Sequence, residues 1–199
     1  MPTFEPIPLE GRFIRLEPLA AHHKQGLCAA IQDGKLWTLF VTHVPHPNDI
    51  EAFYAQAQAS FKAGEGLTFV IIDKKTGKIS GSTQFMNTDW QHKRLTIGLT
   101  FIGKSWQKTR TNTEAKLLML KYAFQSLNMN RVEFYADYLN FKSRQAILRL
   151  GAKEEGLLRC HRVMADGRIR DSMLYSIVFI EWDGVKLNLL HKLKSWEEG

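Results

Sequence analysis

A polar, basic loop that runs into a long amphipathic helix, at residues 106–127, constrains this chain more than any other stretch. Thr111 and Glu114 have the T-x-x-E spacing of a capping box, which predicts that the helix begins there. A strand-like run at 95–102 comes directly before the loop. Because this order presents free backbone amides and the positive end of a helix dipole, the stretch is predicted to bind phosphate. The buried face of the helix has i, i+3, i+4 spacing and consists of Ala115, Leu118, Met119, Tyr122, Ala123 and Leu127.

Two hydrophobic periodicities divide the rest of the chain: alternation with period two marks strands, and i, i+3, i+4 spacing marks helices. The strand–helix–strand step at 95–135 implies a parallel strand pair with a right-handed crossover, and the strands before it form an antiparallel meander. The pattern predicts a mixed α/β fold in a single domain over 1–199. Strands are predicted at 12–19, 67–72, 78–86, 95–102, 131–135, 155–164 and 172–180, and helices at 20–32, 50–63, 113–127, 140–150 and in the tail 183–199.

Composition excludes several classes of protein. With 44% hydrophobic and 24% charged residues, the 199-residue chain has the composition of a soluble globular domain, and no apolar run approaches the ~20 residues of a membrane helix. The first residues lack a signal-peptide pattern, and Cys28 and Cys160 stand apart without a Cys/His cluster, so we expect a cytoplasmic protein with reduced thiols and no metal. The net charge of +7 is compatible with binding to nucleic acid, to an acidic protein or to a polyphosphate ligand. Because the basic residues are dispersed along the chain, charge alone does not distinguish these ligands.

A P-loop pattern, G-x-x-x-x-G-K-S, occurs at 98–105. The four residues between its glycines are strand formers, and the predicted helix cap at Thr111 comes well after Lys104. We therefore interpret Lys104 as a solvated turn residue, and magnesium-dependent ATP binding would be the observation that favours the P-loop.

Five segments together resemble the GCN5-related N-acetyltransferases, in particular their RimJ/RimL-like branch. They read GRFIRLEPL at 11–19, ISGSTQF at 79–85, TIGLTFIGKSW at 96–106, RVEFYADYLNFKSRQAILRLGAKEEGLLR at 131–159 and GRIRDSMLYSI at 167–177. The resemblance implies the GNAT fold, which is a mostly antiparallel twisted sheet with one splayed parallel strand pair and helices on both faces. It also implies acetyl-CoA as cosubstrate, with its pantetheine arm in the splay and its pyrophosphate on the loop.

The resemblance assigns the cofactor-binding positions. The family loop commonly carries glycine at the positions of Arg110 and Asn112, and we expect these two side chains to contact phosphate instead. A backbone amide of the strand at 99–101 is expected to stabilise the developing oxyanion. The strand and loop positions implied to bind acetyl-CoA are Leu99, Thr100, Phe101, Ile102, Gln107, Lys108, Thr109, Arg110, Thr111, Asn112 and Thr113.

The N-x-x-S motif at Asn140 and Ser143 matches the same branch. It implies that Asn140 binds the pantetheine amide and that Ser143, the catalytic candidate, lies near the sulfur; Asn140 can also be a plain helix cap. The tyrosine that many relatives use as an acid is replaced by Ile147, and the glutamate that some use as a base is replaced by Thr96. The general base stays open among His43, His92, His161 and Asp171, and the alternatives are a base that acts through water or no base at all.

We expect Trp37 and His43, in the variable wall at 36–46, to contact the acceptor. The predicted function is acetyl-CoA-dependent N-acetylation of a primary amine, on a protein N-terminus or a small molecule, by direct attack in a ternary complex. The predicted partners are acetyl-CoA and the amine, without membrane or nucleic acid, in a monomer or homodimer. The alternative is a non-catalytic module that binds through its basic surface, with salt-sensitive binding and no thioester turnover.

Overall fold

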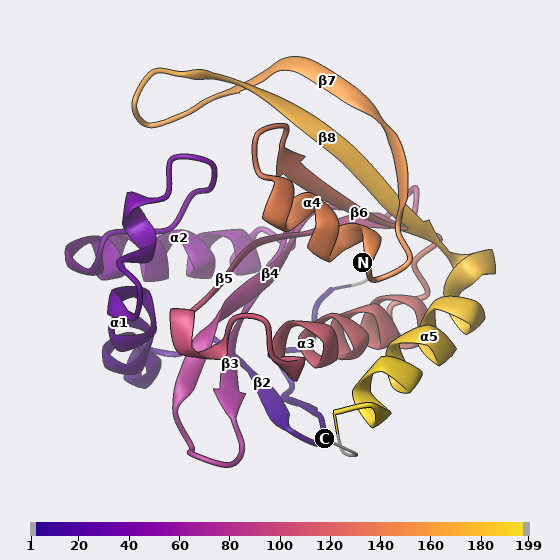
Figure 1. Ribbon diagram of the computed structural model, residues 1–199, viewed down its shortest axis with the longest axis horizontal. Coiled ribbons are helices and arrows are strands. Elements are labelled where there is room, and N and C mark those ends of the chain that lie inside the picture. Colours follow the sequence, from indigo (N-terminus) through magenta and orange to yellow (C-terminus); the bar gives the residue numbers. More distant parts are fainter. Residues whose placement is uncertain (1–2, 197–199) are drawn as a thin grey trace.

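The computed structural model describes residues 3–196, in which one twisted sheet carries helices on both faces (Figure 1). The sheet has the strand order β1-β2-β3-β4-β5-β6-β8-β7, and every neighbouring pair is antiparallel except β5 and β6. The predicted mixed α/β fold with one parallel pair is therefore confirmed. The strands are β1 (Leu9–Glu10), β2 (Ile14–Pro18), β3 (Leu67–Asp73), β4 (Ile79–Asp89), β5 (Arg94–Ile102), β6 (Arg131–Asp137), β7 (Lys153–Val163) and β8 (Ile169–Val178).

Two hydrophobic cores lie on the two faces of the sheet. Strand β3 is buried on both sides, so that Phe69 and Ile71 point into one core and Val70 and Ile72 into the other. Helices α1 and α2 cover the second core, and α3 and α5 pack on the first, where α4 also lies against β6. The helices are α1 (Lys24–Gln32), α2 (Ile50–Lys62), α3 (Arg110–Lys121), α4 (Phe141–Leu148) and α5 (Trp182–Lys194), with a π-helical turn at Tyr122–Ser126.

The parallel pair β5–β6 is short. Its three residue pairs end at Thr96 and Glu133, although both strands continue well beyond. Strand β5 then contains one extra residue relative to β4, and Leu99 adopts a φ of +44° at this bulge. The bulge bends β5 away from β6 and leaves an unpaired gap between 98–102 and 134–137. This gap has the form of the predicted splay.

The start of α3 corrects the predicted capping box. The helix begins at Arg110, and its cap is Thr109, whose Oγ1 accepts the amide hydrogen of Thr111 at 3.3 Å. Glu114, which is buried, instead accepts hydrogen bonds at 2.6–2.8 Å from three backbone amides ahead of β2, those of Arg12, Phe13 and Ile14. The turn before β2 leaves these amides without sheet partners, and the carboxylate satisfies them. The T-x-x-E spacing at 111–114 was thus a wrong indication of the cap, and Glu114 ties α3 to the first strands.

The other helix signals are confirmed, with small differences at the ends. Asn140 caps α4, and Gly151 adopts a φ of +100° after it. The tail forms α5, while its last residues, 197–199, lie outside the described part of the chain. Both cysteines are free thiols. No helix within residues 3–196 is long and apolar enough to cross a membrane.

The P-loop interpretation of 98–105 fails on structure. Gly98 and the four residues after it belong to β5, and Lys104 opens a short 3-10 turn. Helix α3 begins only at Arg110, so no helix N-terminus follows Lys104 directly.

Candidate functional site

The loop from β5 to α3 is closed against the end of the strand. The side-chain amide of Gln107 donates to the carbonyl of Ile102 at 2.8 Å, and Thr109 Oγ1 donates to the carbonyl of Trp106 at 2.7 Å. Lys108, between them, takes a φ of +58°, in the left-handed region. The loop therefore turns back sharply over the end of β5, where α3 begins.

The two positions where the family has glycine lie inside α3. Arg110 and Asn112 are residues of its first turn and have helical backbone conformations, so neither needs the conformational freedom of glycine. The guanidinium of Arg110 lies over the ring of Phe13, 4.0 Å from its centroid. The loss of both glycines is thus compatible with an ordinary helix start.

The first turn of α3 can receive an anion. Amides at the start of a helix have no acceptor within the helix, and only that of Thr111 is satisfied by the cap. The side chain of Thr111 is buried at 3% exposure, and the first turn contains no acidic residue. The backbone amides of Arg110 and Asn112 and the helix dipole therefore provide a positive cradle, which fits a pyrophosphate.

Asn140 and Ser143 lie at the start of α4, directly after β6. Asn140 Oδ1 accepts the amide hydrogen of Ser143 at 3.0 Å, so the helix cap expected for Asn140 is confirmed. The side-chain nitrogen of Asn140 takes no part in this cap and can donate to a ligand. Ser143 is half-buried in the first turn of the helix, at the same edge of the sheet as the gap.

Lys116 lies beneath β4 and β5, next to the bulge that borders the gap. This buried lysine projects from α3 and donates to Thr83 Oγ1 on β4 at 2.8 Å and to Thr100 Oγ1 on β5 at 2.7 Å. Burial away from water lowers the pKa of its amine to about 7. The amine ties β4 to the segment of β5 that follows the bulge. No local sequence pattern indicated that one lysine of this basic stretch would be buried.

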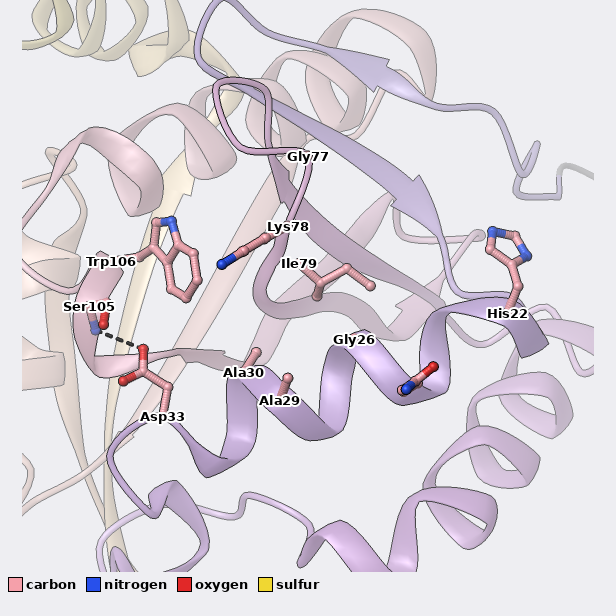
Figure 2. Close-up of a pocket in the computed structure, with 11 residues that line it drawn as sticks. His22, Gly26, Ala29, Ala30, Asp33, Gly77, Lys78, Ile79, Ser105 and Trp106 are labelled. Atoms are coloured by element: carbon pink, nitrogen blue, oxygen red, sulfur yellow. Dashed lines mark hydrogen bonds between the residues drawn. The ribbon is translucent and has the colours of Figure 1, made fainter.

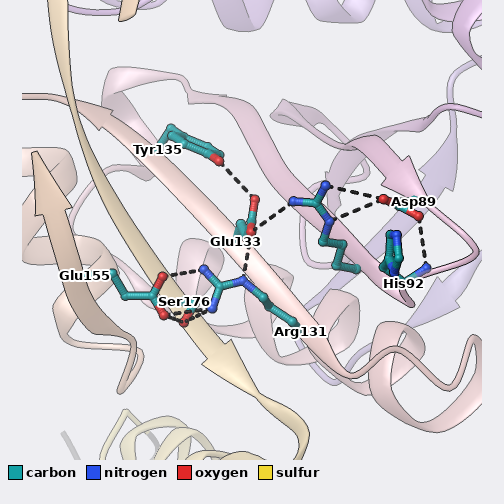
Figure 3. Close-up of polar contacts among 8 residues, drawn as sticks. Asp89, His92, Arg131, Glu133, Tyr135, Glu155 and Ser176 are labelled. Carbon is teal, nitrogen blue, oxygen red and sulfur yellow. Dashed lines mark hydrogen bonds and ion pairs between the residues drawn. The ribbon is translucent and has the colours of Figure 1, made fainter. Parts of the chain in front are cut away.

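A polar network covers the opposite face of β6 (Figure 3). Glu133 accepts from Arg131 Nε at 2.7 Å and from the hydroxyl of Tyr135 at 2.9 Å, and Arg131 also pairs with Glu155. Glu133 of β6 pairs with Thr96 of β5 in the parallel ladder. Thr96 stands where some relatives have a glutamate, so in this chain a carboxylate lies on the neighbouring strand instead. Sequence reasoning missed Glu133; the alternation of polar and apolar residues over 131–137 was the signal that could have found it.

The structure separates the four candidate bases. His161 stacks on Tyr135, with 5.4 Å between ring centroids, and its pKa is lowered by burial and by the positive charges of Arg162 and Arg170. The other three lie elsewhere: His92 is exposed in the β4–β5 turn, His43 is exposed in the loop 36–46, and Asp171 accepts the amide hydrogen of Cys160 at 2.7 Å. The ring of His161 thus contacts a side chain of the polar face that carries Glu133, whereas His92 is linked to Glu133 through its backbone amide, Asp89 and Arg94 (Figure 3).

The predicted acceptor wall faces the β7–β8 hairpin. Trp37 is half-buried, packs on the core beneath α1 and α2, and meets His46 edge to face at 5.1 Å. Arg168 of the hairpin donates to the carbonyl of Phe40 at 3.0 Å and so joins the two elements. The loop 36–46 and the hairpin therefore flank the polar face of β6.

A groove of about 560 Å³ lies on the α1 side of the molecule (Figure 2). It runs between α1, the β3–β4 turn and Trp106, and α1 contributes the small residues Gly26, Ala29 and Ala30 to its lining. Asp33 at its end accepts the amide hydrogen of Ser105 at 2.8 Å. None of the predicted cofactor or acceptor residues lines this groove, so we do not place the active site there.

Glu17, His22 and His23 lie close enough to suggest a metal site. Both ring nitrogens of His23 are engaged, Nδ1 as acceptor from the Ala20 amide at 3.1 Å and Nε2 with Glu17 at 2.9 Å. A metal on Nε2 would place the ring proton on Nδ1, against the Ala20 amide hydrogen. The arrangement suits a neutral histidine that caps a turn, in agreement with the lowering of its pKa by burial.

Comparison with known proteins places the fold among acetyltransferases. The model of a family described as acetyltransferase (GNAT) domain matches residues 14–153. An uncharacterized N-acetyltransferase of Bacillus licheniformis, p20, is 32% identical over 121 residues, which are 61% of this chain and 67% of that protein. A GCN5-related N-acetyltransferase from Brucella melitensis has the same fold, with a TM-score of 0.84 and 32% identity over 96% of this chain and 86% of its own. RimJ of Mycobacterium smegmatis, solved in complex with CoA-disulfide, shares the fold at a TM-score of 0.78 and 20% identity, over 90% of this chain and 88% of its own.

Proposed function

The chain belongs to the GNAT family of acetyltransferases, and we propose that it transfers the acetyl group of acetyl-CoA to a primary amine by direct attack in a ternary complex. The observation that carries the proposal is the end of β5–β6 pairing at Thr96 and Glu133, on the strand that leads through the loop into the first turn of α3. The gap offers unpaired strand backbone to an amide-bearing arm, and the helix start offers amides to a pyrophosphate. A single ligand that extends from the gap to the helix start would contain both an amide-bearing arm and a pyrophosphate, as CoA does.

The loop from Gln107 to Thr113 would hold the pyrophosphate mainly through its backbone, because several of its polar side chains bond within the protein. Arg110 can add a contact, since a guanidinium stacked on an aromatic ring by its face keeps its edge N–H groups available. The backbone of Leu99–Ile102 would lie along the pantetheine arm, and Asn140 would donate to it through its side-chain nitrogen. An amide near the bulge would face the developing oxyanion.

The acceptor amine would approach over the polar face of β6. His161 is our proposed base, because its lowered pKa keeps the imidazole neutral and able to accept a proton at neutral pH. Ser143, near the sulfur, would supply a proton to the leaving thiolate. Trp37 and His43 would contact the acceptor from the loop 36–46 and limit its size on that side.

Calorimetric titration with acetyl-CoA tests the proposal, together with a thiol assay for CoA release in the presence of a panel of amines. We expect saturable binding, weakened by at least about tenfold in Asn140→Ala through loss of a buried hydrogen bond. Asn48→Ala, an exposed asparagine before α2, is the matched control. Absence of acetyl-CoA binding would leave only a module that binds through its basic surface.

A further inference from the structure

A second cluster of charged residues lies further along the polar face, at the end of β6. Asp137 pairs with Ser172 of β8, and Arg170 of β8 pairs with Arg162 of β7. Paired residues of antiparallel strands project to the same side of a sheet. The cluster therefore stands on the face that carries Glu133, opposite to the core under α3.

The acceptor atoms of Asp137 are already in use. Its Oδ1 accepts the amide hydrogen of Leu139 at 2.9 Å, and its Oδ2 accepts from Arg168 at 2.6 Å, with Arg170 Nε at 4.0 Å. Asp137 is 1% exposed. A single carboxylate thus faces two guanidinium groups, and a net positive charge remains.

Several buried polar atoms of the cluster have no hydrogen-bond partner among the described residues. They are Nε of Arg168, Nε of Arg170, Oγ of Ser172 and Nδ1 of His161. Arg170 is 8% exposed and Ser172 is fully buried. Because a guanidinium can only donate, the missing partner of the two arginines must be an acceptor. Orphaned donors of this kind are costly unless a ligand or water satisfies them.

Along the strand direction, the cluster lies at the height of the bulge in β5, where the thioester of acetyl-CoA is expected. Thr96 and Glu133 are neighbours in the ladder, and Thr100 and Asp137 each come four residues later, roughly 13 Å further along. Arg168 also bonds to Phe40, so the cluster is enclosed by the loop 36–46. An anionic group of the acceptor that bound here would hold its amine over the gap.

We propose that Arg168, Arg170 and Ser172 bind a carboxylate of the acceptor, so that the enzyme prefers primary amines that carry a nearby carboxylate. The inference rests on the proposed acetyl transfer. The carboxylate can come from a free amino acid or from an acidic residue next to a peptide N-terminus, and matched ligands separate the two sources.

Binding to the CoA-saturated protein tests the inference by calorimetry. The first pair of ligands is Ala-Asp-amide and Ala-Asn-amide, and the second is alanine and alaninamide. We expect the carboxylate member of at least one pair to bind about tenfold tighter or better, the usual size of a charged hydrogen bond. Arg170→Met should abolish the preference, and Arg170→Lys should keep part of it, because lysine retains the charge without the planar fork.

Arg159→Met, which removes an exposed arginine from the same hairpin, is the matched control and should retain the preference. In acetylation assays the loss in Arg170→Met should appear in KM rather than kcat. If Arg170→Met fails to fold, Ser172→Ala removes one donor at smaller risk and should weaken the preference. Equal binding of both members of each pair, or no binding of either carboxylate, overturns the inference. Failure of CoA itself to bind would instead overturn the proposed function.

Discussion

The two surfaces that meet at the gap between β5 and β6 are built from different parts of the chain. At the start of α3, the side chains of Gln107, Thr109 and Thr111 bond within the protein, so that backbone amides face the ligand. On β6 and β8 the surface consists of charged side chains, with Asp137 and Arg168 as a pair. A surface of amides depends on the fold of its loop, whereas a surface of side chains depends on each residue. The first should therefore tolerate substitution and the second should not.

The largest effect is expected from removing the buried carboxylate of the second surface. Asp137→Ala removes the acceptor of the Leu139 amide and the carboxylate that faces Arg168 and Arg170, and we expect it to lower the free energy of unfolding by about 3 kcal/mol. Urea denaturation measures this loss. Glu154→Ala, which removes an exposed carboxylate 3.8 Å from Arg144, should cost less than about 1 kcal/mol.

The double variant Asp137→Ala with Arg168→Met shows where the cost arises. If it comes from an uncompensated guanidinium, removal of Arg168 should restore part of the lost stability, because the remaining positive charge falls. Equal stability of Asp137→Ala and the wild-type protein would show that the charged surface is as tolerant as the amide surface, and the contrast between them would be lost.

Lys116 permits a second test, because it supports the segment of β5 that borders the gap. Because burial lowers its folded-state pKa to about 7, well below the unfolded value, the unfolded chain binds more protons between about pH 7 and 10.5. The free energy of unfolding should therefore rise with pH in this window, by up to about 1.4 kcal/mol per pH unit from this residue. In Lys116→Met that contribution should vanish, and about 2 to 3 kcal/mol should separate the two pH responses between pH 7 and 9.

Urea denaturation of both proteins at pH 7 and pH 9 gives the comparison, since tyrosine and cysteine titrations are shared and cancel. Lys121→Met, at the exposed end of α3, should keep the wild-type response. The same response in wild type and Lys116→Met would mean that the amine stays charged in the folded protein. If the amine supports the β5 segment through Thr100, Lys116→Met should also weaken acetyl-CoA binding.

Local patterns predicted most of the fold but less of the site. Strand alternation and the Asn140 cap are signals within a few residues, and the structure confirms them. Glu114 has its partners about 100 residues earlier in the chain, so its spacing from Thr111 suggested a local role that it does not have. Contacts so distant in sequence leave no periodic trace.

The gap itself shows the same limit. The resemblance led us to expect a splay, but its cause here is a bulge at Leu99, a residue type that rarely adopts positive φ. The importance of Glu133 depends on which strand lies beside Thr96, and that neighbour is set by the crossover through α3. Residues whose role follows from strand pairing become visible only when the pairing is known.

The smallest effect is expected at the amide surface. The double variant Arg110→Gly with Asn112→Gly restores the glycines of the family, yet both positions already have helical backbone. We expect acetyl-CoA affinity to change by less than about threefold, about 0.6 kcal/mol, while stability falls by up to about 1 kcal/mol per glycine. Lys108→Gly is the control, because glycine suits its φ of +58° and should not destabilise the loop. A tenfold gain in affinity in the double variant would show that the two side chains obstruct the phosphate, and that the family's glycines provide space rather than conformational freedom.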